Sequence, residues 1–192
     1  MLPTAVKHLL IINIIMYLAT IVLERRGMFG ITNALALWSF ESGNFHIWQL
    51  VTYMFMHANT GHLIFNMFAL WMFGYVLENY WGTRRYLIYY FVCGIGAGLV
   101  NDLIPGGLTV GASGAVYGLL LAFGMLFPNE RIYLYFLVPI KAKWFVIGYA
   151  IIELFEGVVG TADHVAHFAH LGGMVFGLIL ILYWRKHPFS RF

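Results

Sequence analysis

Charged side chains are scarce in this chain. Only 10% of its 192 residues are Asp, Glu, Lys or Arg, whereas 61% are hydrophobic and 18% are aromatic. Soluble domains average about 25% charged residues. A chain of this length cannot hide so much apolar surface in a soluble core, whereas a lipid bilayer accepts it. The scarcity of charge therefore excludes a soluble protein and predicts an integral membrane protein.

Cysteine is nearly absent as well. Cys93 is the only one, and it lies within an apolar run. A single cysteine excludes an intramolecular disulfide and a thiolate metal cluster, so we expect it to pack as a small hydrophobic side chain. The net charge of +3 bears on orientation in a membrane rather than on a nucleic-acid partner, and we expect no nucleic acid to bind.

Long runs with little or no charge give six expected membrane spans. Each crossing takes about 20 residues, so six crossings leave roughly 70 residues for loops and tails, too few for a second folded domain. We therefore expect one all-α membrane domain over residues 1–192, a bundle of six transmembrane helices with no soluble domain. The expected spans are residues 6–23, 62–77, 86–103, 112–127, 144–155 (with Glu153 inside) and 167–184.

The first span is expected to stay in the protein, because it lacks a small-residue cleavage site and is followed directly by Glu24, Arg25 and Arg26. A long aromatic segment separates it from the second span. This composition is typical of a loop that lies in the membrane interface. Its aromatic residues include Trp38, Phe40, Phe45, Trp48, Tyr53 and Phe55.

Basic residues fall unevenly on the expected loops. With the amino terminus in the cytoplasm, only Arg25 and Arg26 lie outside. This asymmetry follows the positive-inside rule and predicts that both termini are cytoplasmic. The basic residues placed inside are Lys7, Arg84, Arg85, Arg131, Lys141, Lys143, Arg185, Lys186 and Arg191.

Serine is rare too, and Ser113 is the only one of four serines inside an expected span. Polar groups at membrane depth are costly unless they are paired or line a water-filled cavity, so they indicate function. The spans that carry Asn66, Ser113 and His170 all begin on the outer side under this topology. We therefore expect these three side chains to meet at a similar depth, in a site that opens to the outer side.

Glycines favour close contact between two of these spans. Gly114 and Gly118 are four residues apart, as are Gly173 and Gly177, and such small-residue faces let helix backbones approach closely. Taken alone, a Gly-Ala-Ser-Gly stretch more often indicates packing than catalysis.

A serine beside an imidazole can lose its proton as it attacks a carbonyl, which is the minimum arrangement for acyl transfer. No Asp or Glu is obviously placed as a third member, so the sequence favours a Ser113–His170 dyad. Tyr117 lies one turn after Ser113 and is expected to pack on His170. Helical N–H groups at Ser113, with His62 and Asn66, are expected to bind the oxyanion.

Two other interpretations of the histidines are metal binding and haem ligation. His164, His167 and His170 could form a metal site, but no acidic residue lies on the same turn, so we expect no metal. Haem ligation between His57 or His62 and the later histidines conflicts with close glycine packing. His164 and His167 are expected to lie in a loop or at the interface.

With these motifs the chain resembles the rhomboid family of intramembrane serine proteases. The family pattern H-x-x-x-x-H-x-x-x-N matches His57, His62 and Asn66, and G-x-S-G matches Gly111, Ser113 and Gly114. The pattern A-H-x-x-G-x-x-x-G matches Ala169, His170, Gly173 and Gly177, and E-x-x-x-G matches Glu78 and Gly82. The resemblance covers a core of about residues 45–184. Many family members carry Trp-Arg where this chain has Trp48-Gln49.

The resemblance implies a six-helix bundle of the prokaryotic form in the cell (inner) membrane, with a Ser113 nucleophile and a His170 base. It implies no cofactor, and it implies transmembrane protein substrates cut near their outer ends. It also suggests that substrates pass beside the fifth span, which has no expected catalytic group. Two alternatives stay open: a non-catalytic rhomboid-like protein that binds membrane clients, and a small transporter.

Overall fold

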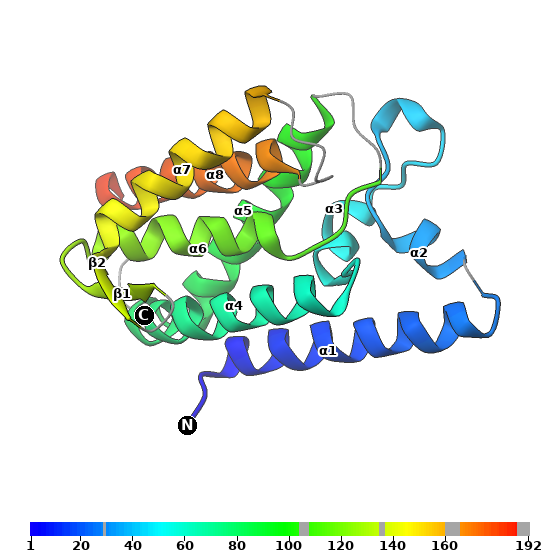
Figure 1. The fold of residues 1–192 in the computed structure, drawn as a ribbon, viewed down its shortest axis with the longest axis horizontal. Coiled ribbons are helices and arrows are strands. Elements are labelled where there is room, and N and C mark those ends of the chain that lie inside the picture. The colour runs from blue at the N-terminus through cyan, green and yellow to red at the C-terminus, as the bar shows by residue number, and fades with distance from the viewer. Residues whose placement is uncertain (29, 104–107, 135–136, 160–165, 188–192) are drawn as a thin grey trace.

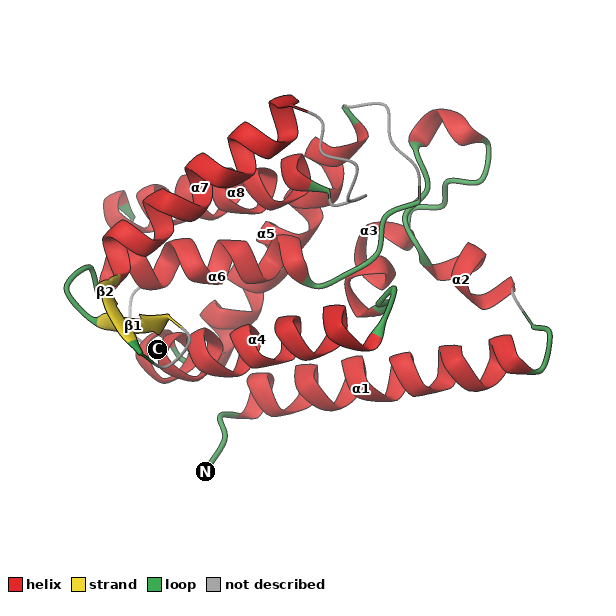
Figure 2. Cartoon of the chain, viewed as in Figure 1, coloured by secondary structure: helices red, strands yellow, loops and turns green. Residues whose placement is uncertain are grey.

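The computed structural model is an all-α bundle, as the sequence predicts (Figures 1 and 2). It describes residues 1–28, 30–103, 108–134, 137–159 and 166–187. The six long helices are α1 (Thr4–Arg25), α4 (Thr60–Trp81), α5 (Thr83–Asp102), α6 (Ser113–Leu126), α7 (Ala142–Val159) and α8 (His167–Lys186).

Each expected span coincides with one of these helices. By length and composition, α1, α4 and α8 could each cross a membrane, and α6 is a shorter apolar helix. In Figure 1 the amino terminus, the hairpin between α6 and α7 and the carboxyl end of α8 lie at one end of the bundle. The end of α1 and the starts of α4, α6 and α8 lie toward the other, so these long helices run along a common axis.

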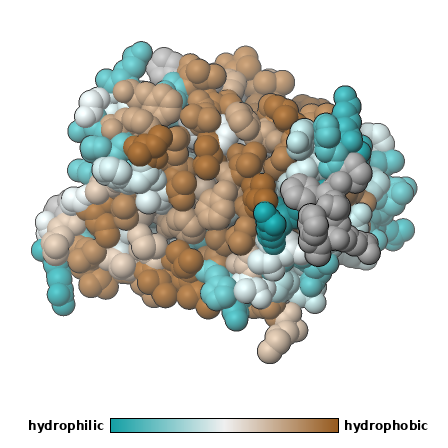
Figure 3. Space-filling view, turned by 180° about the vertical axis from the view of Figure 1, so that it is seen from behind, coloured by the Kyte–Doolittle hydropathy of each residue, from teal (hydrophilic) through white to brown (hydrophobic). Residues whose placement is uncertain are grey.

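Apolar side chains cover the flank of the bundle between its two ends. Figure 3 shows them as a continuous belt, with polar side chains gathered toward the sides of the view. Many of the exposed apolar side chains belong to α1 and α7, among them Ile15, Leu18, Ile151, Phe155 and Val158. A belt of this kind suits contact with lipid chains rather than with water.

Two short strands were not predicted from the sequence. β1 (Arg131–Leu134) and β2 (Val138–Lys141) pair antiparallel, with Arg131 opposite Lys141. They form a hairpin between α6 and α7 in a segment that was expected to be a plain loop. The two strands satisfy each other's backbone hydrogen bonds, and the hairpin reverses the chain so that α7 returns alongside α6.

The aromatic segment after α1 folds into short helical pieces. These are α2 (Gly30–Leu35), the 3₁₀ turn η1 (Phe40–Ser42), α3 (Gln49–Thr52) and the 3₁₀ turn η2 (Tyr53–Phe55). Trp48 is exposed, as a side chain in the interface should be, but Tyr53 is buried and donates a hydrogen bond to the Gly94 carbonyl at 2.6 Å. Part of the segment therefore lies at the interface, and part is buried against α5.

Gln49 organises this loop. Its side chain is fully buried; Oε1 accepts the backbone N–H of His46 at 3.1 Å, and Nε2 donates to the Asn44 carbonyl at 3.2 Å. The neighbouring Trp48 donates its indole N–H to the Ala34 carbonyl at 2.9 Å. Buried polar groups that are satisfied in this way fix a single loop conformation. The Trp48-Gln49 pair thus anchors the loop.

Glu78 ties the start of α1 to α4. Its carboxylate accepts the backbone N–H groups of Ala5 and Val6, each at 2.8 Å, and the Thr83 hydroxyl at 2.6 Å. The first N–H groups of a helix have no partner within the helix, and Pro3 supplies no side-chain cap. Glu78 therefore caps α1 from a neighbouring helix.

The core of the bundle is built where α5, α6 and α8 meet at glycines. A Cβ atom added at Gly173 of α8 would overlap the carbonyl oxygen of Gly114 in α6, and one added at Gly118 would overlap Cys93 of α5. Cys93 is fully buried, as expected of a small hydrophobic side chain. Gly177 lies against Tyr89 and Cys93 in the same way. The small-residue faces predicted from the sequence are confirmed.

Candidate active site

Ser113 is the first residue of α6, and its position is set by the loop that leads into it. Thr109 pairs with Leu37 of the first loop through two backbone hydrogen bonds of 2.9 Å, and the Gly111 N–H donates to the Tyr53 carbonyl at 2.9 Å. The amino-terminal N–H groups of α6 surround Ser113 and carry the positive end of the helix dipole. The first loop therefore holds the start of α6 in place.

Gly111 has to be glycine for two reasons. Its φ of +127° is one that residues with a side chain rarely adopt, and a Cβ here would lie 2.7 Å from Cε1 and 2.8 Å from Nε2 of His62. The same added atom would lie 3.6 Å from the Ser113 hydroxyl oxygen. Gly111 thus makes room for the His62 ring close to Ser113.

His170 of α8 lies against Ser113. Its Nε2 is 2.9 Å from Ser113 Oγ, and the ring is buried. The distance is that of a hydrogen bond, and it is possible because α6 and α8 are in contact at Gly114 and Gly173, one turn further into the bundle. The structure brings together the two residues that the sequence proposed as nucleophile and base.

Tyr117 packs on the face of the His170 ring. The two ring centroids are 4.2 Å apart and the planes are inclined by 6°. This stacking was predicted from the position of Tyr117 one turn after Ser113, and it is confirmed. It prevents the imidazole from swinging away from the serine.

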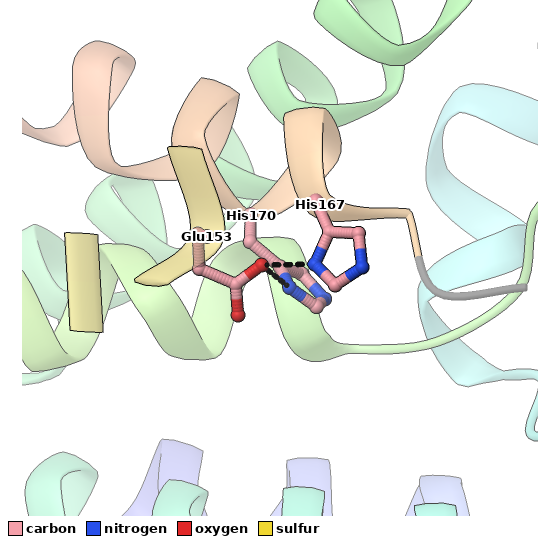
Figure 4. A group of neighbouring side chains, drawn as sticks. All are labelled: Glu153, His167 and His170. Carbon is pink, nitrogen blue, oxygen red and sulfur yellow. Dashed lines mark hydrogen bonds and ion pairs between the residues drawn. The ribbon is translucent and has the colours of Figure 1, made fainter. Parts of the chain in front are cut away.

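The expectation that no acidic residue reaches His170 is wrong. Figure 4 shows one carboxylate oxygen of Glu153, on α7, facing the rings of both His170 and His167 on α8. One carboxylate oxygen, Oε2, lies 2.9 Å from His170 Nδ1 and 2.8 Å from His167 Nδ1. The other oxygen, Oε1, accepts a hydrogen bond from the Tyr117 hydroxyl. Glu153, His167 and His170 are buried, so the fifth span does carry a group that contacts the site.

The sequence contained a signal for Glu153 that was not followed. It is a lone acidic residue inside an apolar span, and such residues mark functional sites by default. Glu153 lies 17 residues before His170, too far along the chain for helical spacing to connect the two. Only the packing of α7 on α8 reveals the contact.

His167 does not lie in a loop, contrary to the prediction. It is the first residue of α8 and is buried, with Nδ1 on Glu153 and 3.5 Å from Oε2 of Glu156. His167 therefore satisfies the buried Glu153 carboxylate and also lies beside the part-exposed Glu156. His164 lies outside the described residues.

Three possible metal ligands also meet at this site. Glu153, His167 and His170 each present one possible ligand atom, and these atoms lie within 4.8 Å of one another. Two imidazoles and a carboxylate are donors that zinc uses. The missing acidic ligand is thus present in space, although the same three atoms are satisfied by mutual hydrogen bonds.

The expected oxyanion-binding residues lie at the start of α4. Asn59 caps this helix by accepting the His62 backbone N–H at 2.8 Å, and the His62 ring lies against Gly111. Asn66, one turn further, donates one amide N–H to the His62 carbonyl at 2.9 Å. An amide carries a second N–H. The structure thus places His62 close to the serine loop and Asn66 behind it on the same helix.

His57 lies just before α4 and packs against His62. Its ring meets His62 edge to face, with centroids 5.1 Å apart. The side chain is 7% exposed, and burial, together with the charge of His62, lowers the pKa of His57 to about 4. His57 is therefore neutral at neutral pH and acts as a packing support for His62.

Comparison with known proteins gives one consistent family. A family model described as "Rhomboid domain" matches residues 44–187. The chain is 33% identical over 191 residues to "Rhomboid-like protein 11, chloroplastic" of Arabidopsis thaliana, covering 94% of this chain and 65% of that protein. It is 28% identical over 187 residues to "Rhomboid protease GlpG" of Photorhabdus laumondii, covering 95% of this chain and 62% of that protein.

A third relative matches over a shorter stretch. The chain is 37% identical over 136 residues to "RHOMBOID-like protein 1" of Arabidopsis thaliana, covering 70% of this chain and 33% of that protein. The chain thus spans between one third and two thirds of the length of these curated relatives.

Proposed function

The chain belongs to the rhomboid family, and from that premise we propose that it is an intramembrane serine endopeptidase. Ser113 is the nucleophile and His170 the general base. The observation that carries the proposal is the 2.9 Å contact between His170 Nε2 and Ser113 Oγ. A relative named as a rhomboid protease matches 95% of this chain, which supports the same activity.

In the proposed reaction, the Ser113 oxygen attacks the carbonyl carbon of the scissile peptide bond while its proton passes to His170 Nε2. The carbonyl electron pair moves to oxygen, and this oxyanion is bound by the N–H groups at the start of α6 with His62 and Asn66. When the C–N bond breaks, His170 gives the proton to the leaving amine. Water then releases the acyl group from Ser113 by the same steps. No cofactor takes part.

The proposed substrates are membrane proteins whose transmembrane segments are cut near one face of the bilayer. Ser113, His62 and His170 belong to the first turns of α6, α4 and α8, and these helix starts lie away from the basic hairpin in Figure 1. The positive-inside rule places that hairpin in the cytoplasm, so the site opens to the outer side of the cell membrane and both described ends lie inside. The described chain then forms one membrane domain.

The test uses a fluorophosphonate probe, because its phosphonyl group reacts only with an activated serine. The purified protein in detergent should be labelled at Ser113. Ser113→Ala and His170→Ala should not be labelled, whereas Ser42→Ala, a change of an exposed loop serine, should be labelled at the wild-type rate. The same pattern is expected for cleavage of a transmembrane substrate.

Equal labelling of the wild type and His170→Ala would show that the serine is merely accessible, and it would overturn the proposal. Absence of labelling and cleavage in a folded wild-type protein would favour the non-catalytic alternative.

A further inference from the structure

We propose that Glu153 is the positioning residue of this active site, which holds His170 in the one tautomer that can accept the Ser113 proton. The inference rests on the proposed function of Ser113 and His170. It assigns the third position to a carboxylate on a different helix. The arrangement is then a Ser113–His170–Glu153 triad assembled from α6, α8 and α7.

Three hydrogen-bond donors surround the Glu153 carboxylate. Glu153 is 5% exposed, and within the described part of the chain three groups converge on it: Tyr117 Oη on Oε1, and the Nδ1 atoms of His167 and His170 on Oε2. An ionised carboxylate only accepts hydrogen bonds. All three groups therefore donate to it, and charge-assisted bonds of this kind are stronger than neutral ones.

The second argument concerns the His170 ring itself. A neutral imidazole carries one N–H. When that hydrogen lies on Nδ1 and points at Glu153, Nε2 presents a lone pair to Ser113 Oγ, 2.9 Å away. The Ser113 hydroxyl then donates to Nε2, which is the direction that proton transfer requires. With the other tautomer, Nε2 would point a hydrogen at the serine and could not act as a base.

The third argument is the charge that develops during the reaction. Proton transfer from Ser113 creates an imidazolium at His170 in a buried site. The Glu153 carboxylate, 2.9 Å from Nδ1, lies where it compensates that charge. The carboxylate keeps its own charge throughout, and the proton on Nε2 goes to the leaving amine. Tyr117 fixes both partners, because it stacks on the His170 ring and donates to Glu153.

The test compares Glu153→Gln with the matched variant Glu156→Gln. Both remove one carboxylate from α7, but only Glu153 contacts His170; Glu156 lies 3.5 Å from His167. The amide can turn its NH₂ group toward Nδ1, which favours the wrong tautomer. Turnover by Glu153→Gln should therefore fall by about 10²-fold or more, with KM little changed; the corresponding change in a Ser-His-Asp triad costs about 10⁴-fold. Glu156→Gln should keep wild-type turnover, and Glu153→Asp should recover part of the loss.

Nitrogen-15 NMR of the histidine rings provides a readout that a merely structural role would not move. His170 should show a protonated Nδ1 and an unprotonated Nε2 in the wild type and in Glu156→Gln. In Glu153→Gln the hydrogen should move to Nε2 in a folded protein. The His170→Ala variant identifies the signal.

Wild-type turnover by folded Glu153→Gln, or an unchanged His170 tautomer, would overturn the inference and leave the Ser113–His170 proposal standing. Failure of the proposed function looks different: the wild type would then be neither labelled nor active, while the tautomer of His170 would still report on the contact with Glu153. A loss of turnover equal in Glu153→Gln and Glu156→Gln would also contradict the inference, since it would reflect α7 packing alone.

Discussion

Gly173 lies against the backbone of Gly114, so that α8 and α6 touch without intervening side chains. This contact lies one turn beyond His170 and sets the distance from its ring to Ser113. Any atom added at the contact has to separate the two helices on which the active site is built, because a backbone carbonyl cannot move aside as a flexible side chain can.

The first prediction tests this contact. Gly173→Ala should destabilise the protein by about 3 kcal/mol or more, the upper part of the range for overpacked sites, and folded material should have lost its fluorophosphonate labelling. Gly148→Ala is the matched control, because a Cβ at Gly148 of α7 meets no atom within 4 Å. Thermal unfolding in detergent measures both. Wild-type stability of Gly173→Ala would show that α6 and α8 are not in direct backbone contact.

The second prediction concerns the cap on α1. Glu78→Ala leaves the N–H groups of Ala5 and Val6 without their acceptor and should lower the free energy of unfolding by about 1.5–3 kcal/mol. Glu78 lies 16 residues beyond His62 on α4, about 24 Å along the helix, so the labelling rate of folded protein should not change. Glu130→Ala, at an exposed position, is the control for removing an acidic residue. A loss of labelling with full stability would place Glu78 in the active site instead.

The third prediction is a pH dependence of stability caused by His57. Unfolded His57 takes up a proton near pH 6.5, whereas the folded protein resists it down to about pH 4. Between these values the unfolded state binds more protons, so stability falls as the pH falls, by about 2 kcal/mol from pH 7 to pH 5. The effect fades above pH 6.5 and is absent by about pH 8. In His57→Phe the unfolding temperature should depend less on pH than in the wild type, whereas His8→Gln, at an exposed histidine, should behave as the wild type does. Equal pH dependence in all three would contradict the prediction.

The fourth prediction tests orientation. In a Cys93→Ala background, Ser42→Cys in the first loop should react with an impermeant maleimide added to intact cells. Lys186→Cys, near the end of α8, should react only after the membrane is made permeable. Both positions are exposed, so accessibility to the reagent depends on the side of the membrane. The reverse pattern would invert the topology and place Ser113 at the cytoplasmic face.

Local patterns were sufficient to predict the helices and one side of the site. Uncharged runs located the six long helices to within a few residues, since apolar length depends only on neighbours along the chain. Spacing also placed Tyr117 on the His170 side of its helix, because one helical turn fixes which side chains share a face.

The contacts of Glu153 could not be predicted from such local patterns. Its partners belong to two other helices, and whether it reaches them depends on the rotation and tilt of α7, which hydrophobic runs do not encode. Local patterns also fail for Gln49, because its side chain bonds backbone groups elsewhere in the loop. Tyr53 has the composition of an interfacial aromatic residue, but it is buried against α5. Polar side chains with distant partners need three-dimensional packing to be interpreted.

The contact between Glu153 and His170 depends on how α7 packs against α8. Much of the outer surface of α7 carries exposed apolar side chains, whereas Glu153 binds Tyr117, His167 and His170 on the inner side. If α7 swings outward as a rigid body to admit a substrate helix, it carries Glu153 away and leaves His170 without the partner that orients it. Under the proposed function, His170 would then be correctly oriented, and peptide bonds would be cut, only while α7 is packed against the bundle.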